Sequence, residues 1–206
     1  MTRALVFVAC ACISTALAAG GYLEDKDHLA KHQNAWRAIK SMREMYLYQR
    51  SYEKAVIFEK DSYCIRAYIL ANDSETHTAT ETFRFVVNKK DHIEEGVVEY
   101  FKVLNTTDPK SRRVLYFTGG KGDPAKPIEL PVAFTNYKSC LILRVPKAEE
   151  GGAQNACQMW VDKAHIVKPS ACCQFIYDLL CGPTTHVIYD KTQCAREDAV
   201  DPLVEA

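Results

Sequence analysis

The sequence has no excess of charge of either sign and, after its first nineteen residues, no long hydrophobic run. Its 26 Lys and Arg residues balance 26 Asp and Glu residues, so the formal net charge is 0. Proteins that bind nucleic acid or a membrane surface usually carry a basic footprint. We therefore expect neither a nucleic acid nor a membrane as partner. No segment after the first nineteen residues is apolar enough for a membrane anchor.

The local motifs of common enzyme classes are also missing. The sequence contains no Gly-x-Ser-x-Gly elbow, no His-Glu-x-x-His helix and no P-loop. The run 119–122, Gly-Gly-Lys-Gly, is interpreted as a hairpin loop because it has no strand-to-helix context. His28 and His32 are spaced for one face of a helix, but no nearby group completes a metal site. We therefore expect no enzyme, no metal and no cofactor.

The first nineteen residues have the pattern of a cleavable secretory signal. Arg3 precedes the apolar run LVFVACACI, and small residues at 16–19 offer a cleavage site. We predict cleavage after Ala18 or Ala19, which removes Arg3 and leaves a net charge of about −1. The expected product is a secreted, extracellular protein in which residues 20–206 form one domain.

Cysteine usage and glycosylation sequons agree with the secretory route. Of the nine cysteines, Cys10 and Cys12 lie in the signal, so seven remain. Most should pair in an oxidising compartment, and the odd one is left as a free thiol or in an intermolecular bond. The sequons that begin at Asn72 and Asn105 lie beside predicted turns and predict a glycoprotein.

The periodicity of apolar residues predicts eight short strands between two helices. The first helix is predicted over 27–42. The second starts at Pro169 and Ser170, ends at Gly182 and Pro183, and has an apolar face formed by Cys172, Phe175, Ile176, Leu179 and Leu180. Turn signals delimit strands at 44–54, 62–71, 78–88, 96–105, 112–118, 127–136, 140–146 and 156–163.

This order of elements favours an all-β protein. Strands joined by turns form an antiparallel meander, and eight of them can close into a barrel that holds one small ligand. A β-sandwich is the alternative. The flanking helices and the lack of an immunoglobulin Cys…Trp…Cys spacing weigh against it.

Several short elements follow one another in a distinctive order. They are Ala35-Trp36, Cys64, Tyr137 to Cys140, Met159-Trp160, the helix entry from Pro169 to Cys172, and Cys194. Their order resembles the tick salivary lipocalins of the histamine-binding-protein-like group. The resemblance implies an eight-stranded antiparallel lipocalin barrel with an N-terminal helix and a C-terminal helix packed outside. It also implies secretion in tick saliva and evasion of host defence by sequestering a small host mediator.

The same resemblance implies a pattern of disulfides. The two pairs shared with the family would be Cys64–Cys194 and Cys140–Cys172, and Cys157–Cys181 would be an additional bridge. Cys173 is then left over, although Cys172 and Cys173 can exchange roles, because sequence alone does not fix connectivity. The oligomeric state expected from this pattern is a monomer or a dimer linked through Cys173.

The resemblance also implies a ligand-binding set in the barrel interior. A buried cation needs a carboxylate, and aromatic faces add cation–π attraction. The matching aromatic positions are Tyr52, Phe58, Tyr116 and Trp160. Positions that are acidic in histamine binders fall at Gln158, at Ala55 and near Leu130. Asp162 shares a strand face with Gln158 and Trp160 and is the candidate replacement acid, followed by Glu95 and Glu99.

The leading expectation is a binder of a biogenic amine, histamine or serotonin. Because a neutral amide replaces an acid at Gln158, we expect weaker histamine binding than in amine-specialised relatives, or a preference for serotonin or an amphipathic lipid. A second possibility is an eicosanoid or fatty acid such as a leukotriene, with Arg50, Arg66, Arg84 or Arg144 binding its carboxylate. A third is a complement-type inhibitor of a host protein that acts through its outer surface.

Overall fold

The computed structural model describes residues 22–25, 27–53, 57–58, 61–87, 93–103, 113–117, 127–150, 152 and 155–199. The predicted signal segment, Ala55 and Asn105 lie outside these ranges. Nine strands are found in the described residues: β1 Glu44–Arg50, β2 Ser62–Asp73, β3 Thr78–Val87, β4 Ile93–Lys102, β5 Val114–Phe117, β6 Ile128–Thr135, β7 Cys140–Arg144, β8 Cys157–Asp162 and β9 His186–Val187. The helices are η1 Leu23–Asp25, η2 Asp27–His32, α2 Ala35–Ser41, α3 Pro146–Glu150, η4 Lys163–His165, α4 Ala171–Cys181 and α5 Lys191–Ala199.

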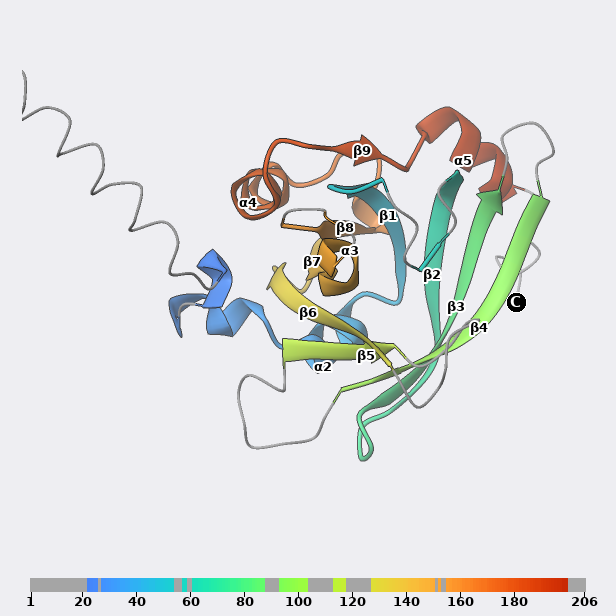
Figure 1. Ribbon diagram of the computed structural model, residues 1–206. Helices are drawn as coiled ribbons and strands as arrows, with labels where there is room; N and C mark the ends of the chain where they lie inside the picture. The colour runs from blue at the N-terminus through green and yellow to red at the C-terminus, as the bar shows by residue number, and fades with distance from the viewer. Residues whose placement is uncertain are drawn as a thin grey trace, which may run out of the picture.

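The strands form one antiparallel sheet that curls round on itself (Figure 1). Its order is β2-β3-β4-β5-β6-β7-β8-β1-β9, and β1 pairs with β2 as well as with β8. The double pairing of β1 brings the two ends of the meander together. The predicted eight-stranded antiparallel barrel is therefore confirmed, and β9 is a short extra strand paired with the end of β1.

Two separate hydrophobic clusters follow from the alternation along the strands. Inward residues such as Leu47, Phe83 and Trp160 form the inner cluster, which fills the barrel and packs against α2. Outward residues such as Met159 and Val161 form the outer cluster, which α4 covers. Among the described helices, none is long and apolar enough to cross a membrane.

The first predicted helix is split into η2 and α2. Gln33 is buried between them, and its amide donates to the carbonyls of Glu24 and Ala133, at 2.8 and 3.2 Å. Asn34 then caps α2, because its side chain accepts a hydrogen bond from the Arg37 N–H at 2.7 Å. The polar contacts of Gln33 and Asn34 override the helical periodicity of 27–42.

The face of α4 that packs on the barrel differs from the predicted face. Cys173, Tyr177, Leu180 and Cys181 are buried, whereas Phe175 and Leu179 are 65% and 54% exposed. Of the predicted face, Leu180 is buried and Ile176 packs partly against the outer cluster. The buried face is therefore rotated from the predicted one by about one residue, or about 100° around the helix.

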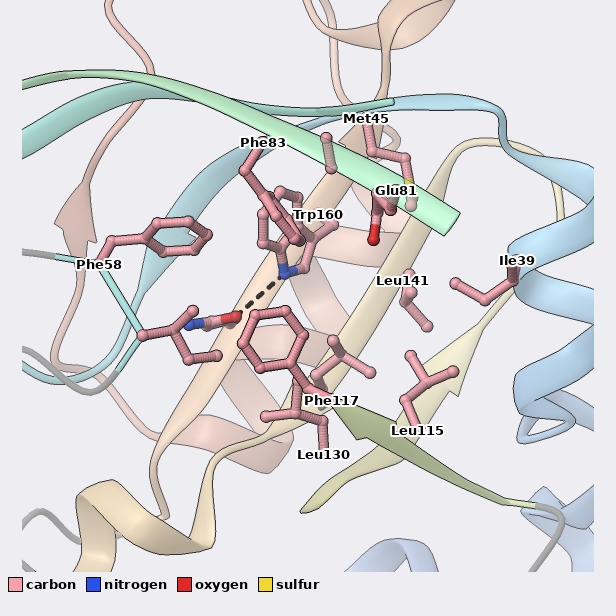
Figure 2. Close-up of a pocket in the computed structure, with 14 residues that line it drawn as sticks. Ile39, Met45, Phe58, Glu81, Phe83, Leu115, Phe117, Leu130, Leu141 and Trp160 are labelled. Atoms are coloured by element: carbon pink, nitrogen blue, oxygen red, sulfur yellow. Dashed lines mark hydrogen bonds between the residues drawn. The ribbon is translucent and has the colours of Figure 1, made fainter. Parts of the chain in front are cut away.

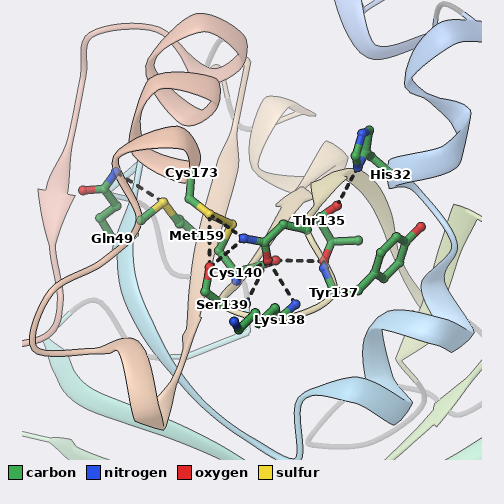
Figure 3. Close-up of a disulfide and its surroundings, with 10 residues drawn as sticks. His32, Gln49, Thr135, Tyr137, Lys138, Ser139, Cys140, Met159 and Cys173 are labelled. Carbon is green, nitrogen blue, oxygen red and sulfur yellow. Dashed lines mark hydrogen bonds between the residues drawn. A yellow bond between two sulfur atoms is a disulfide. The ribbon is translucent and has the colours of Figure 1, made fainter.

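Three disulfides join α4 and α5 to the barrel, and all six of their cysteines belong to the outer cluster. Cys64 bonds to Cys194 and Cys157 bonds to Cys181, as the family resemblance implied. The third pair is corrected: Cys140 bonds to Cys173 and not to Cys172 (Figure 3). Cys173 is on the buried face of α4, whereas Cys172 is an exposed free thiol. A dimer linked through Cys173 is therefore excluded, since its sulfur is already bonded.

A buried ion pair joins the N-terminal segment to β7 and α4. The Arg144 guanidinium donates from Nε and Nη2 to the two carboxylate oxygens of Glu24, and Nη2 also donates to the Leu180 carbonyl at 2.9 Å. The ring of Tyr22 lies over the same guanidinium, 4.2 Å from its centre. Arg144 thus has a structural role and is not available to a ligand.

Asn72 is exposed near the end of β2, so its glycosylation stays a prediction.

We expect one reactive thiol per chain in the protein before reduction. Alkylation followed by peptide mapping should modify Cys172 alone, because the other described cysteines are bonded. Cys172→Ser should change the free energy of unfolding by less than about 0.5 kcal/mol. Cys173→Ser should lower it by roughly 3–4 kcal/mol, through loss of a crosslink across 33 residues. Alkylation of Cys173 instead would contradict this connectivity.

Removing the partner of the buried arginine should destabilise the protein strongly. Glu24→Gln leaves the Arg144 charge uncompensated, with an expected loss of about 3–5 kcal/mol in the free energy of unfolding. Glu150→Gln, at an exposed position at the end of α3, is the matched control and should have little effect. Urea unfolding of the two variants gives the comparison, and equal stabilities would show that the ion pair contributes nothing.

Candidate functional site

A cavity inside the barrel is the candidate binding site, and we call it the barrel cavity. About 370 Å³ of empty space lies among its lining side chains, and this volume includes solvent where the cavity is open. Most of the wall is aliphatic or aromatic. The lining residues are Ile39, Met45, Ile57, Phe58, Ala67, Glu81, Phe83, Leu115, Phe117, Leu130, Leu141, Leu143, Gln158 and Trp160.

Four aromatic rings form one side of the barrel cavity (Figure 2). Phe58 lies 5.3 Å from Phe83 and 6.2 Å from Trp160, measured between ring centroids. Phe83 lies 6.0 Å from Trp160 and 5.8 Å from Phe117. The rings meet at tilted or edge-on angles, which are arrangements that aromatic pairs prefer.

Glu81 is the one carboxylate among the described lining residues. It lies on β3 between the inward residues Ala79 and Phe83, and only 2% of it is exposed. Burial raises the pKa of Glu81 from its ordinary value of 4.5 to about 8. Among the described residues, no charge or hydrogen bond offsets this burial. A carboxyl buried without a partner is costly, and an incoming cation would compensate it.

Sequence reasoning had not proposed Glu81 as a site residue, although a signal was present. Glu81 alternates with Phe83, Phe85 and Val87, so a charged residue stands on the apolar face of a predicted strand. Such a residue is either an acid paired within the fold or a group that binds a ligand. The lack of an ion partner for Glu81 among the described residues favours a ligand-binding role.

A hydrogen-bonded row of Tyr52, Gln158 and Trp160 lies along the cavity wall. The Trp160 indole N–H donates to the Gln158 carbonyl oxygen at 3.1 Å, shown by the dashed line in Figure 2. The Gln158 amide nitrogen donates to the Tyr52 hydroxyl at 2.5 Å. All three side chains are at most 5% exposed. Burial raises the pKa of Tyr52 to about 12, so its hydroxyl stays neutral.

The structure brings together only part of the predicted ligand set. Phe58, Gln158 and Trp160 line the cavity, and Tyr52 belongs to the inner cluster and hydrogen-bonds to Gln158 without being one of the lining residues. Tyr116 does not line it, because its strand neighbours Leu115 and Phe117 point inward and successive side chains alternate. Leu130 lines the cavity as an aliphatic residue.

Asp162 is not the replacement acid. Its carboxylate accepts a hydrogen bond from the Ala164 N–H at 3.0 Å and lies 3.3 Å from His165 Nδ1. It therefore caps η4 at the end of β8, because the free N–H groups of a helix start attract a carboxylate. The side chains of Glu95 and Glu99 lie outside the described part of the structure, although the backbone register places Glu99 opposite Glu81.

No Lys, Arg or His is among the described residues that line the barrel cavity. Of the arginines considered for a lipid carboxylate, Arg66 pairs with Glu44 and Arg144 pairs with Glu24. Arg50 lies beside Tyr52, with its guanidinium 5.6 Å from the ring centroid. Burial lowers the pKa of Arg50. The described wall therefore offers one acid and one amide, and no cation for an anionic headgroup.

Of the two histidines considered for a metal site, only the side chain of His32 lies in the described part of the structure. His32 Nδ1 lies 3.2 Å from the Thr135 carbonyl oxygen, and its ring packs against Phe134. Across the described residues, no group of three or more His, Cys, Asp or Glu side chains is arranged to hold a metal ion.

Two solved structures share this fold at low sequence identity. Japanin from Rhipicephalus appendiculatus, bound to cholesterol, superposes with a TM-score of 0.55 at 15% identity, covering 76% of this chain and 97% of its own. Lobster apocrustacyanin A1 superposes with a TM-score of 0.54 at 9% identity, covering 86% of this chain and 92% of its own. At these identities the similarity establishes the fold alone. No curated protein sequence matches the chain.

The sequence itself matches a family model over nearly all of the described range. The model is that of the tick histamine binding protein, and it covers residues 23–196, which include every strand of the barrel and the three disulfides. The predicted resemblance is confirmed, and the chain belongs to the tick histamine-binding protein family of ligand-binding lipocalins.

Proposed function

We propose that this protein sequesters a small aromatic monoamine inside its barrel. The observation that carries the proposal is Glu81, a buried carboxylate without a charge partner in the described structure, placed beside aromatic rings. An ammonium group neutralises the carboxylate, and the faces of Phe83 and Trp160 attract the same cation. Membership of the family supports binding and not catalysis as the activity. The absence from the sequence of a Gly-x-Ser-x-Gly elbow, a His-Glu-x-x-His helix and a P-loop supports the same conclusion.

The ligand in this proposal is small, because the barrel cavity is small and its wall is densely packed. A sterol, such as the cholesterol bound to Japanin, has no cation to compensate Glu81. An eicosanoid would bring a second carboxyl group next to Glu81, and two carboxyl groups in one apolar site cannot readily both ionise, so the pair gains no compensating charge. Both lipid classes are therefore disfavoured relative to an amine by the same residue.

The protein acts outside the cell in this proposal. Its first nineteen residues serve as a signal peptide, residues 20–206 fold as one domain, and the three disulfides suit an oxidising compartment. Sequestration requires only tight binding at the concentration of the host mediator. No host protein partner is needed for this activity.

Removing the charge of Glu81 should weaken amine binding. Glu81→Gln keeps the shape of the side chain but loses a charge-assisted contact, which should cost roughly 1.5–3 kcal/mol, or about 10- to 150-fold in Kd. Calorimetry with histamine, serotonin and tryptamine measures the effect. Glu129→Gln, an exposed residue on the outward face of β6, is the matched control. Unchanged binding in Glu81→Gln would refute the proposed role of this carboxylate.

Amine binding should become tighter as the pH rises from 6 to about 8. In the empty cavity Glu81 holds its proton below about pH 8, so binding an ammonium at lower pH releases one proton. The Kd should fall by about tenfold per pH unit in this window and rise again above roughly pH 10, where the amine loses its own proton.

The sign of this coupling can be checked in the empty protein as well. In the folded protein the pKa of Glu81 is raised above its ordinary value of 4.5. The contribution of Glu81 to the free energy of unfolding is therefore fully present below pH 4.5 and is lost as the pH rises to about 8. For the binding reaction, calorimetry of amine binding in buffers of different ionisation enthalpy counts the proton that Glu81 releases. A Kd that does not vary between pH 6 and 8, or the same slope in Glu81→Gln, would rule out Glu81 as the titrating group.

A further inference from the structure

The orientation of the Gln158 amide is fixed by its neighbours. An indole N–H can only donate a hydrogen bond, so the atom of Gln158 that faces Trp160 must be the carbonyl oxygen. The amide nitrogen therefore faces the Tyr52 hydroxyl, in agreement with the 2.5 Å contact. Unlike most buried amides, this one cannot be flipped without placing two donors against each other.

This arrangement leaves part of the amide free to serve a ligand. A glutamine amide has two N–H donors and two lone pairs on its oxygen. Tyr52 occupies one donor and Trp160 occupies one lone pair. No further hydrogen bond of this amide is found among the described residues, so one N–H and one lone pair remain. Gln158 is 1% exposed and lines the barrel cavity. A buried amide with unused hydrogen-bonding capacity favours a polar partner.

Gln158 and Glu81 lie towards opposite ends of the cavity. Gln158 is opposite Arg50, the last residue of β1. Glu81 is opposite Ile69, whose N–H donates at 2.8 Å to the carbonyl of Arg43, just before β1 begins. In Figure 2, Glu81 and the hydrogen bond from the Trp160 indole lie on different sides of the indole ring.

We infer that Gln158 is a specificity-determining residue that selects amines with a neutral hydrogen-bonding group on the ring. The inference rests on the proposed function and refines its substrate class. With the ammonium at Glu81, the flat part of the ligand lies against Trp160 and Phe83, and its far end reaches the amide. A hydroxyl there both donates to and accepts from Gln158. A second positive charge there has no acid to neutralise it, because the amide is neutral.

The test compares ligands that differ only in this group. Serotonin carries a ring hydroxyl that tryptamine lacks, so the ratio of their Kd values isolates the contribution of the hydroxyl. The wild-type protein should bind serotonin at least about tenfold more tightly than tryptamine, because a site built to bind a hydroxyl penalises the analogue without it. Gln158→Leu should reduce this ratio to about one.

Two further variants separate a loss of selectivity from a loss of structure. Gln158→Met keeps an unbranched side chain of similar length and serves if Gln158→Leu fails to fold. Gln49→Leu changes another buried glutamine, on β1, whose amide contacts Met159 Sδ outside the cavity. This control should keep the full preference for serotonin. Glu81→Gln should weaken both amines and leave their ratio nearly unchanged.

The outcomes distinguish this inference from the proposed function. A wild-type preference for serotonin that disappears in Gln158→Leu or Gln158→Met supports it. Equal affinities in the wild type, or a preference that persists in both variants, overturns it while amine binding stands. If the wild type binds neither serotonin nor tryptamine nor histamine, the proposed function fails and this inference fails with it.

Discussion

The pairing of β1 with both β2 and β8 is the contact on which the rest of the structure depends. It joins the first strand of the meander to the second and to the last, so that the sheet encloses a space instead of lying open. The enclosure removes Glu81 from water and thereby raises the pKa of its carboxyl. It also holds Gln158 and Trp160, both on β8, at the wall of that space. Without this closure, the acid and the amide would be ordinary solvated side chains.

Much of the barrel could be predicted from sequence because alternation is a strong signal where one face of a strand is buried. The places where the alternation is broken could not be predicted from sequence. Cys64 and Tyr63 both belong to the outer cluster, because the pairing of β2 with β3 shifts register there and Cys64 adopts a left-handed backbone with φ of 51°. The shift turns Cys64 towards Cys194. The phase of α4 was missed for a related reason: its outer face is also apolar, so hydrophobicity did not identify the side that packs.

The candidate site was only partly predictable for a different physical reason. Trp160, Phe58 and Gln158 were found because a family resemblance supplied their positions. Asp162 was chosen by strand alternation, but a nearby helix start offers it backbone N–H groups, and this local hydrogen bond determines where its side chain lies. Glu81 could not be identified in this way, since its significance lies in having no charge partner among the described residues. Sequence patterns reveal which face a residue shares, but they do not show whether a buried charge is paired.

The location of the disulfides has a consequence for which amino-acid substitutions the protein can accept. All six bonded cysteines lie in the outer cluster, between the barrel and α4 or α5, and none lines the barrel cavity. The covalent reinforcement is therefore separate from the surface that meets the ligand. Substitutions among the lining residues can alter ligand preference while the outer shell continues to hold the fold together. Such an architecture separates the residues that line the cavity from the covalent bonds that reinforce the fold.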